Sequence, residues 1–164
     1  LRDPVERTVS HWAEQTRNGI ETLTLTGALA EESARVCNDA ERLADGSLGE
    51  SHAHEQQTYA AQSEYAASYR RWIDAVGADR VAVLFSEDYY ADAVTAVRTV
   101  TDLIGVEPVP ANGGAIHRNA APRPSGIDPE VDALLTERFR PDVERLAELL
   151  GSEPPWPRFA VGGR

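Results

Sequence analysis

The residues at the start of this sequence have the types and the spacing to bind an anion. Arg2 stands immediately before Asp3-Pro4, and Arg7 and Ser10 follow within the next eight positions. A guanidinium group forms paired hydrogen bonds to phosphate or sulfate, and a hydroxyl group adds a further donor. Because Arg7 and Ser10 are three residues apart, a helix would place both on one face. The alternative interpretation is an exposed helix start with solvated side chains.

A helix is expected to begin immediately after the first arginine. Asp3 is a residue type that caps helix N-termini, Pro4 suits the first helical position, and Glu6 completes a capping box. Apolar residues then recur at helical spacing until residues 18–19, whose Asn-Gly pair is a typical helix stop. Free N–H groups and the dipole at such an N-terminus favour a bound anion.

Composition limits the classes of function. The 164 residues suffice for one domain with a buried core, and a net charge of -11 argues against a broad nucleic-acid or anionic membrane surface. The chain contains no lysine, so all 16 basic residues are arginine, and a few of these can still form one local anion pocket. The single cysteine, Cys37, excludes an internal disulfide and fits a reducing compartment. We therefore expect a cytoplasmic protein without a membrane span.

Helices dominate the rest of the expected secondary structure. They are predicted over about residues 28–44, 55–76 and 91–104 and from residue 129 onward, the last one broken at Pro141. Apolar stripes on two of them are expected to face the core. The stripe of residues 55–76 comprises Ala61, Tyr65, Tyr69, Trp72, Ile73 and Val76, and that of residues 91–104 comprises Val94, Val97, Val100, Thr101 and Ile104.

One segment, residues 80–88, has the pattern of a strand. Val81–Phe85 is continuously apolar, which is typical of a strand covered on both faces. Since a buried strand needs neighbours, we expect Leu1 to be the last residue of another strand. The sequence thus predicts the C-terminal part of an α/β domain whose remaining strands lie elsewhere.

Three histidines are further candidates for chemistry. His52 and His54 lie in a polar loop, residues 46–55, and supply only two potential metal ligands, so a metal site is not favoured. Either histidine could instead act as a general base near a bound substrate, because a histidine pKa lies close to neutrality. His11 is expected to be a helix-packing residue.

Three segments together resemble the sulfotransferases that use 3′-phosphoadenosine 5′-phosphosulfate (PAPS). LRDPVERTVSHW, residues 1–12, resembles the family's 3′-phosphate-binding motif. Residues 65–106 resemble a later block, in which a helix ends in Trp, a strand ends in Ser-Glu-Asp and a helix leads to Ile-Gly. Residues 139–157 resemble the closing helix and Trp-Pro. Residues 20–60 match least, and that region normally varies with the substrate.

The resemblance implies an α/β, P-loop-like sulfotransferase fold of bacterial type, with residues 1–164 as the mostly helical C-terminal portion. It implies transfer of a sulfuryl group from PAPS to a hydroxyl or amine, which releases adenosine 3′,5′-bisphosphate and needs no metal. Arg2 and Ser10 match the positions that hold the 3′-phosphate, and Arg7 matches a common arginine of the motif. Arg118 and Arg123 are candidate contacts in the late nucleotide-covering loop. In the resemblance, Glu87 has a structural position, so it is expected to cap or pair with nearby groups.

The resemblance also predicts that part of the catalytic machinery lies outside this chain. The family's 5′-phosphosulfate loop precedes the Arg-Asp-Pro strand and usually contains a lysine, and the general base is often upstream as well. We therefore expect another segment or another chain to complete the fold before sulfate can be transferred. Two alternatives stay open: a non-catalytic nucleotide-binding module and a helical interaction module. Carbohydrate, lipid, polyketide and phenolic acceptors all remain possible.

Overall fold

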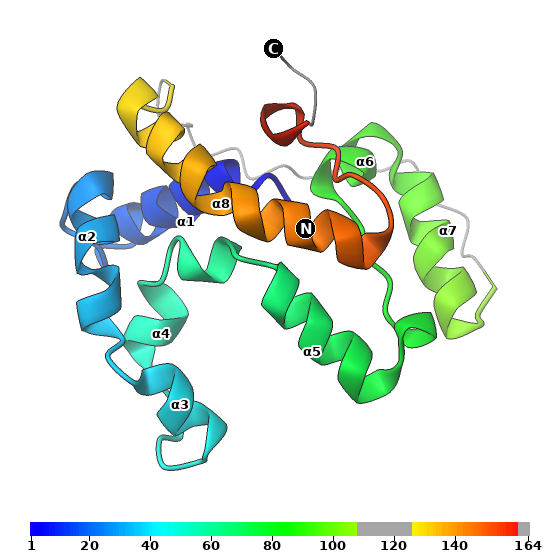
Figure 1. Ribbon diagram of the computed structural model, residues 1–164, viewed down its shortest axis with the longest axis horizontal. Coiled ribbons are helices and arrows are strands. Elements are labelled where there is room, and N and C mark those ends of the chain that lie inside the picture. The colour runs from blue at the N-terminus through cyan, green and yellow to red at the C-terminus, as the bar shows by residue number, and fades with distance from the viewer. Residues whose placement is uncertain (108–125, 161–164) are drawn as a thin grey trace. The chain divides into compact units, whose positions relative to one another are not determined.

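The computed structural model describes residues 1–107 and 126–160, and the secondary structure in these two ranges is helical (Figure 1). The chain forms two compact units that alternate along the sequence. Unit 1 comprises Leu1–Asp3, Tyr65–Pro122 and Asp142–Arg164, and unit 2 comprises Pro4–Glu64 and Arg123–Pro141.

Unit 2 contains the first helix and the region that matches the sulfotransferase pattern least. Its elements are α1 (Pro4–Arg17), α2 (Leu25–Arg35), α3 (Asp39–Ala44), α4 (His52–Gln56), the 3-10 helix η1 (Ala61–Ser63) and the first part of α8 (Pro129–Leu150). The predicted start and end of α1 are confirmed. Val5, Thr8 and Val9 form the face of α1 that is buried, as their helical spacing requires.

The prediction of one helix over residues 28–44 is wrong, because α2 and α3 are separate. Between them Asn38 adopts a left-handed conformation with φ of 62°, which asparagine tolerates better than most residues and which interrupts helical hydrogen bonding. Cys37 lies in this interruption and is exposed, so a helical position for its thiol is also incorrect.

The prediction of one helix over residues 55–76 is wrong as well. Ser51 caps α4 by accepting a hydrogen bond from the His54 N–H at 3.0 Å, so that helix begins inside the predicted polar loop. The chain then leaves the helical path because the Glu32 carboxylate accepts hydrogen bonds from three successive backbone N–H groups, at residues 59–61. A second helix, α5 (Ala66–Val76), starts afterwards and ends at Gly77, as predicted.

Unit 1 contains α5, the rest of α8 and the C-terminal turn. Its other elements are the 3-10 helix η2 (Ala78–Arg80), α6 (Ser86–Ala91), α7 (Ala93–Ile104) and the 3-10 helix η3 (Pro157–Phe159). Trp156 is 2% exposed, and its ring packs against those of Tyr65, Phe85 and Phe159. Val143 and Leu146 of α8 are buried in the same unit.

Residues 80–88 do not form the predicted strand. Val81–Phe85 has no regular secondary structure, although the backbone is extended at both of its ends, and α6 begins at Ser86. The Leu1 amino group donates to the Leu84 carbonyl, and the Ser86 N–H donates to the Leu1 carbonyl at 2.6 Å. These two bonds flank Phe85 in the manner of a parallel strand pair. The segment is extended but forms no ladder of hydrogen bonds, because Leu1 is its one strand-like partner within residues 1–107 and 126–160.

The predicted inward face of α7 is wrong. Val94, Val97, Val100 and Ile104 are all exposed, and Ala96 is the buried residue of this helix. Trp72 of α5 is likewise 63% exposed, whereas Tyr65 is buried as predicted. The helical spacing of these apolar residues is real, but no part of unit 1 that the structure describes buries Trp72 or the four exposed residues of α7.

The predicted break at Pro141 is wrong, since α8 runs from Pro129 to Leu150 without interruption. Proline removes one backbone hydrogen bond from a helix interior. Buried apolar residues lie on both sides of it, Leu135 and Phe139 before and Val143 and Leu146 after, so each half of α8 is held by its own unit.

Candidate functional site

Hydrogen bonds hold three successive residues of unit 1, Leu1–Asp3, which lead into α1 and are called the Arg-Asp-Pro turn below. Leu1 has the strand-like bonds described above. The Tyr65 hydroxyl donates to the Arg2 carbonyl at 2.9 Å, and the Asp3 N–H donates to the Glu87 carboxylate at 3.1 Å. The backbone on both sides of the Arg2 side chain is therefore fixed. The prediction that Glu87 caps or pairs with nearby groups is confirmed.

The C-terminal segment reaches the same turn. Arg158 of η3 donates from Nε to the Asp3 carboxylate at 2.7 Å, and both side chains are largely buried. The ring of Trp156, just before η3, lies 5.8 Å from that of Tyr65 and 5.6 Å from that of Phe85. Arg158 was missed from the sequence because nothing in its local pattern distinguishes it from a surface arginine.

Asp142 fixes the start of the helix that follows Tyr65. Its carboxylate accepts hydrogen bonds from the backbone N–H of Tyr65 at 2.6 Å and of Ala66 at 3.1 Å. A carboxylate at a helix N-terminus satisfies free N–H groups and complements the dipole. Asp142 therefore orients the residue that holds Arg2, although it lies far away in the sequence.

Arg7 and Ser10 both belong to α1 in unit 2, whereas Arg2 belongs to unit 1. The Arg7 guanidinium donates to the Ser63 hydroxyl at 3.2 Å and to the Gln62 side-chain oxygen at 3.1 Å. Ser10 lies three residues further along α1 and is exposed. Arg7 thus links α1 to η1, while Ser10 is accessible to a ligand.

A polar stripe along α1 continues from Arg7 at four-residue spacing. The His11 ring meets the Tyr59 ring edge-on at 5.1 Å, so His11 is a packing residue of its helix, as predicted. The Gln15 side-chain amide donates to Gln56 at 2.8 Å. Burial, and to a smaller extent the Arg7 charge, lowers the pKa of His11 below its ordinary 6.5.

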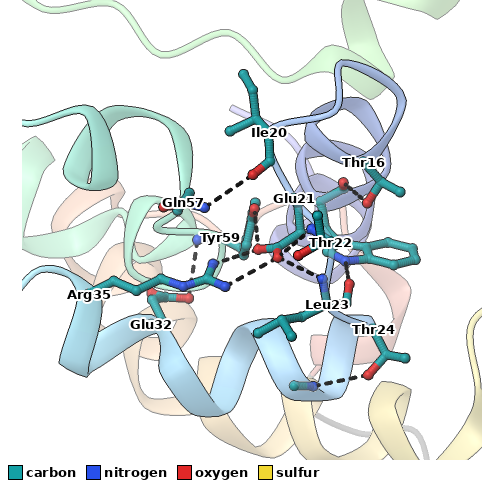
Figure 2. A network of polar contacts seen from close by, with 12 residues as sticks. Thr16, Ile20, Glu21, Thr22, Leu23, Thr24, Glu32, Arg35, Gln57 and Tyr59 are labelled. Atoms are coloured by element: carbon teal, nitrogen blue, oxygen red, sulfur yellow. Dashed lines mark hydrogen bonds and ion pairs between the residues drawn. The ribbon is translucent and has the colours of Figure 1, made fainter.

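A second polar network, centred on Glu21, joins the segment after α1 to α2 and to Tyr59 (Figure 2). Arg35 forms a bidentate pair with Glu21 at 2.5 and 3.2 Å, and the Tyr59 hydroxyl donates to the same carboxylate at 2.9 Å. The N–H groups of residues 22 and 23 also donate to it, both at 2.9 Å.

These contacts shift the pKa values of the titratable groups in the network. The hydrogen bond from Arg35 is the largest cause that lowers the pKa of Glu21 to about 2. Burial, together with the bond to Glu21, raises the pKa of the Tyr59 hydroxyl. The Glu21 carboxylate is therefore ionised, and its hydrogen bonds are made to groups of the protein itself. This is typical of a residue that stabilises the fold.

His52 and His54 lie on α4 rather than in an unstructured loop. His52 is exposed, and the Nδ1 atom of His54 is buried with no hydrogen-bond partner among the residues that the structure describes. Within the described ranges, no three His, Cys, Asp or Glu side chains are grouped so that they could hold a metal ion. Arg118 and Arg123 lie outside the residues that the structure describes.

No family model and no curated protein matches this chain. Among solved structures, it matches the crystal structure of a sulfotransferase from Alicyclobacillus acidocaldarius, with a TM-score of 0.69 and 28% sequence identity. This chain is similar to a sulfotransferase. The match covers 94% of this chain and 53% of that one, so this chain spans about half the length of its structural neighbour.

The comparison supports the sulfotransferase resemblance at the level of overall fold, and the mostly helical ranges 1–107 and 126–160 are compatible with it. None of the helices in these two ranges is both long and apolar enough to cross a membrane.

Proposed function

We propose that this chain is the C-terminal part of a PAPS-dependent sulfotransferase, which transfers a sulfuryl group to a hydroxyl or amine acceptor. The observation that carries the proposal is the similarity to a sulfotransferase over 94% of the chain. The LRDPVERTVSHW motif supports PAPS as the donor. The hydrogen bonds around Arg2 support it further, because a ligand-binding side chain benefits from a fixed backbone.

In this proposal Arg2 and Ser10 bind the 3′-phosphate of the nucleotide. Arg7 belongs to the same motif, but its guanidinium donates to Gln62 and Ser63, so its proposed role is to position α1. Arg118 and Arg123 are proposed contacts of the late loop. A guanidinium and a hydroxyl are well suited to phosphate oxygens, since both donate hydrogen bonds.

The proposed reaction is an in-line displacement at sulfur. The acceptor oxygen or nitrogen forms the new bond to sulfur while the bond between sulfur and the 5′-phosphate oxygen breaks. Adenosine 3′,5′-bisphosphate leaves with the electron pair, and a general base takes the acceptor proton. Catalysis would come mainly from positioning and from stabilisation of the transferred charge, by analogy with phosphoryl transfer. His52 and His54 are the candidate bases that this chain offers.

We also propose that further strands, from another segment of the protein or from another chain, complete a sheet beside Val81–Phe85. The parallel-type bonds of Leu1 support this, as do the backbone N–H groups of Ala82 and Val83, which have no partner among the described residues. A sulfotransferase assay on the 164-residue chain, with PAPS and a panel of acceptors, tests it. Robust turnover by this chain alone would overturn the proposal that it is catalytically incomplete.

Calorimetry with adenosine 3′,5′-bisphosphate tests the nucleotide site. Removing one charge-assisted contact weakens binding by roughly tenfold to a hundredfold, so Arg2→Ala is expected to lose affinity on that scale and Ser10→Ala somewhat less. Arg17→Ala, which removes an exposed arginine from the last position of α1, is the matched control. A wild-type chain that binds adenosine 5′-phosphate as tightly as the bisphosphate refutes the 3′-phosphate site.

A non-catalytic nucleotide-binding module is the second candidate, and the absence of lysine from the sequence favours it. It predicts bisphosphate binding by this chain but no sulfate transfer when the chain is joined to the rest of its protein. The helical interaction module predicts neither binding nor transfer, and the exposed apolar stripe of α7 favours it. Bisphosphate binding by this chain, together with turnover measured when the chain is joined to the rest of its protein, therefore separates all three candidates.

A further inference from the structure

Arg158 and Asp3 place opposite charges directly beside the proposed phosphate contact. Asp3 follows Arg2 in the chain, and Arg158 donates to its carboxylate at 2.7 Å from the C-terminal turn. We propose that Arg158 is a positioning residue for Arg2, acting through Asp3 and not by touching the nucleotide. This inference rests on the proposed function, because it concerns the same 3′-phosphate site.

Through its ion pair with Asp3, Arg158 restrains the backbone of the turn. Asp3 is held twice, by its backbone N–H on Glu87 and by its side chain on Arg158, and the preceding carbonyl is held by Tyr65. Arg158 is itself held in place, since it lies in η3 directly after the buried Trp156, whose ring packs on that of Tyr65. The C-terminal turn and the Arg-Asp-Pro turn therefore stabilise each other.

The electrostatics give Arg158 a second effect. Two carboxylates lie close to the backbone of Arg2 in a chain with a net charge of -11: that of Asp3, the next residue, and that of Glu87, which accepts from the Asp3 N–H. Such carboxylates repel the ligand and compete for the Arg2 guanidinium. Arg158 neutralises Asp3, which is only 7% exposed and therefore poorly screened by water. Without Arg158, the Asp3 carboxylate, one residue from Arg2, would lose this neutralising charge.

The test measures the preference for the 3′-phosphate, defined as the dissociation constant of adenosine 5′-phosphate divided by that of adenosine 3′,5′-bisphosphate. Arg158→Gln is expected to lower this ratio roughly tenfold, as losses of supporting contacts around a binding group commonly do. In a background that carries Asp3→Asn, the same substitution is expected to change the ratio by less than about threefold, because the charge through which Arg158 acts is gone.

The matched control is Arg138→Gln, which breaks the exposed ion pair with Glu64 in unit 2. It is expected to leave the ratio unchanged. A purely structural role for Arg158 would weaken binding of both nucleotides equally, and it would leave the ratio unchanged in Arg158→Gln too. That result, or an equal loss in the Asp3→Asn background, overturns the inference.

Amide hydrogen exchange separates failure of this inference from failure of the proposed function. In the nucleotide-free chain, Arg158→Gln is expected to speed exchange of the Asp3 N–H roughly tenfold, while Arg138→Gln has no effect. A wild-type ratio near one refutes the 3′-phosphate site. Unchanged exchange of the Asp3 N–H in Arg158→Gln refutes the positioning role, whatever the nucleotide measurements show.

Discussion

Replacing Glu21 by glutamine should strongly destabilise unit 2. The side chain keeps its size, but the charge that pairs with Arg35 is lost, and Tyr59 and two backbone N–H groups keep a weaker acceptor. Glu21 is 3% exposed, so water cannot replace the missing partner. Arg35, whose side chain is 18% exposed, would be left as a largely buried and unpaired cation.

The pKa of Glu21 gives the size of the effect. A pKa of about 2 in the folded chain, compared with the ordinary 4.5, corresponds to roughly 3 kcal/mol of stabilisation at neutral pH. Because the folded-state pKa is the lower one, this stabilisation is complete well above pH 4.5 and is lost as the pH falls toward 2. The difference between wild type and Glu21→Gln should shrink over the same interval.

Urea denaturation at 25 °C measures this difference. With a slope of about 2 kcal/mol per molar urea, a loss of about 3 kcal/mol lowers the midpoint by about 1.5 M at pH 7. Circular dichroism at 222 nm reports the helices, and repeating the titration from pH 7 down to pH 3 tests the predicted narrowing of the difference between the two proteins.

Glu64→Gln supplies a matched control for the same substitution. Glu64 pairs with Arg138 on the surface, where both side chains are about 40% exposed, so its loss should cost less than about 1 kcal/mol and shift the midpoint little. If Glu21→Gln is no more destabilising than Glu64→Gln at pH 7, the buried network does not stabilise the fold as argued.

Three further predictions concern stability. Because the pKa of His11 is lowered in the folded chain, the unfolded chain binds a proton there more readily. The free energy of unfolding of wild type should therefore fall as the pH falls below 6.5. In urea titrations between pH 7.5 and 5.5, His11→Gln should lose less of this free energy than wild type does. Asn38→Ala should destabilise by about 1 kcal/mol because of the left-handed backbone, whereas Asn38→Gly should not, which thermal unfolding of the pair would show. Asp142→Asn should weaken the cap of α5 by about 1 kcal/mol and speed amide exchange at Tyr65 and Ala66, and unchanged exchange would contradict that role.

Local sequence signals predicted helix ends better than helix continuity. The first helix begins at Pro4 and ends at Arg17, and Gly77 and Gly105 end α5 and α7, because the signals for these ends lie within a few residues. The interruption between α4 and α5 could not be predicted in this way. It depends on Glu32, a carboxylate 27 residues before the first backbone N–H that it binds.

For the candidate site, the sequence predicted the motif but not its support. Arg2 and Ser10 were identified from residue types, spacing and the family resemblance, and their role in nucleotide binding stays a prediction. Glu87 was correctly expected to be structural. Arg158 and Asp142 were missed, because each contacts its partner across more than 70 residues and no periodic pattern records such a contact.

By itself, the sequence determined where apolar stripes run, which residues begin and end several helices, and which short motif resembles a phosphate site, since all of these depend on residues within about two turns of one another. The tertiary structure alone decided which stripes are buried: Tyr65 packs against Trp156, whereas Val94 and Ile104 of an equally regular stripe are exposed. It also decided that the Arg-Asp-Pro turn is held by Tyr65 and Arg158. The physical reason is that burial and buried ion pairs require a partner from elsewhere in the chain, and residue spacing describes one side of such a contact only.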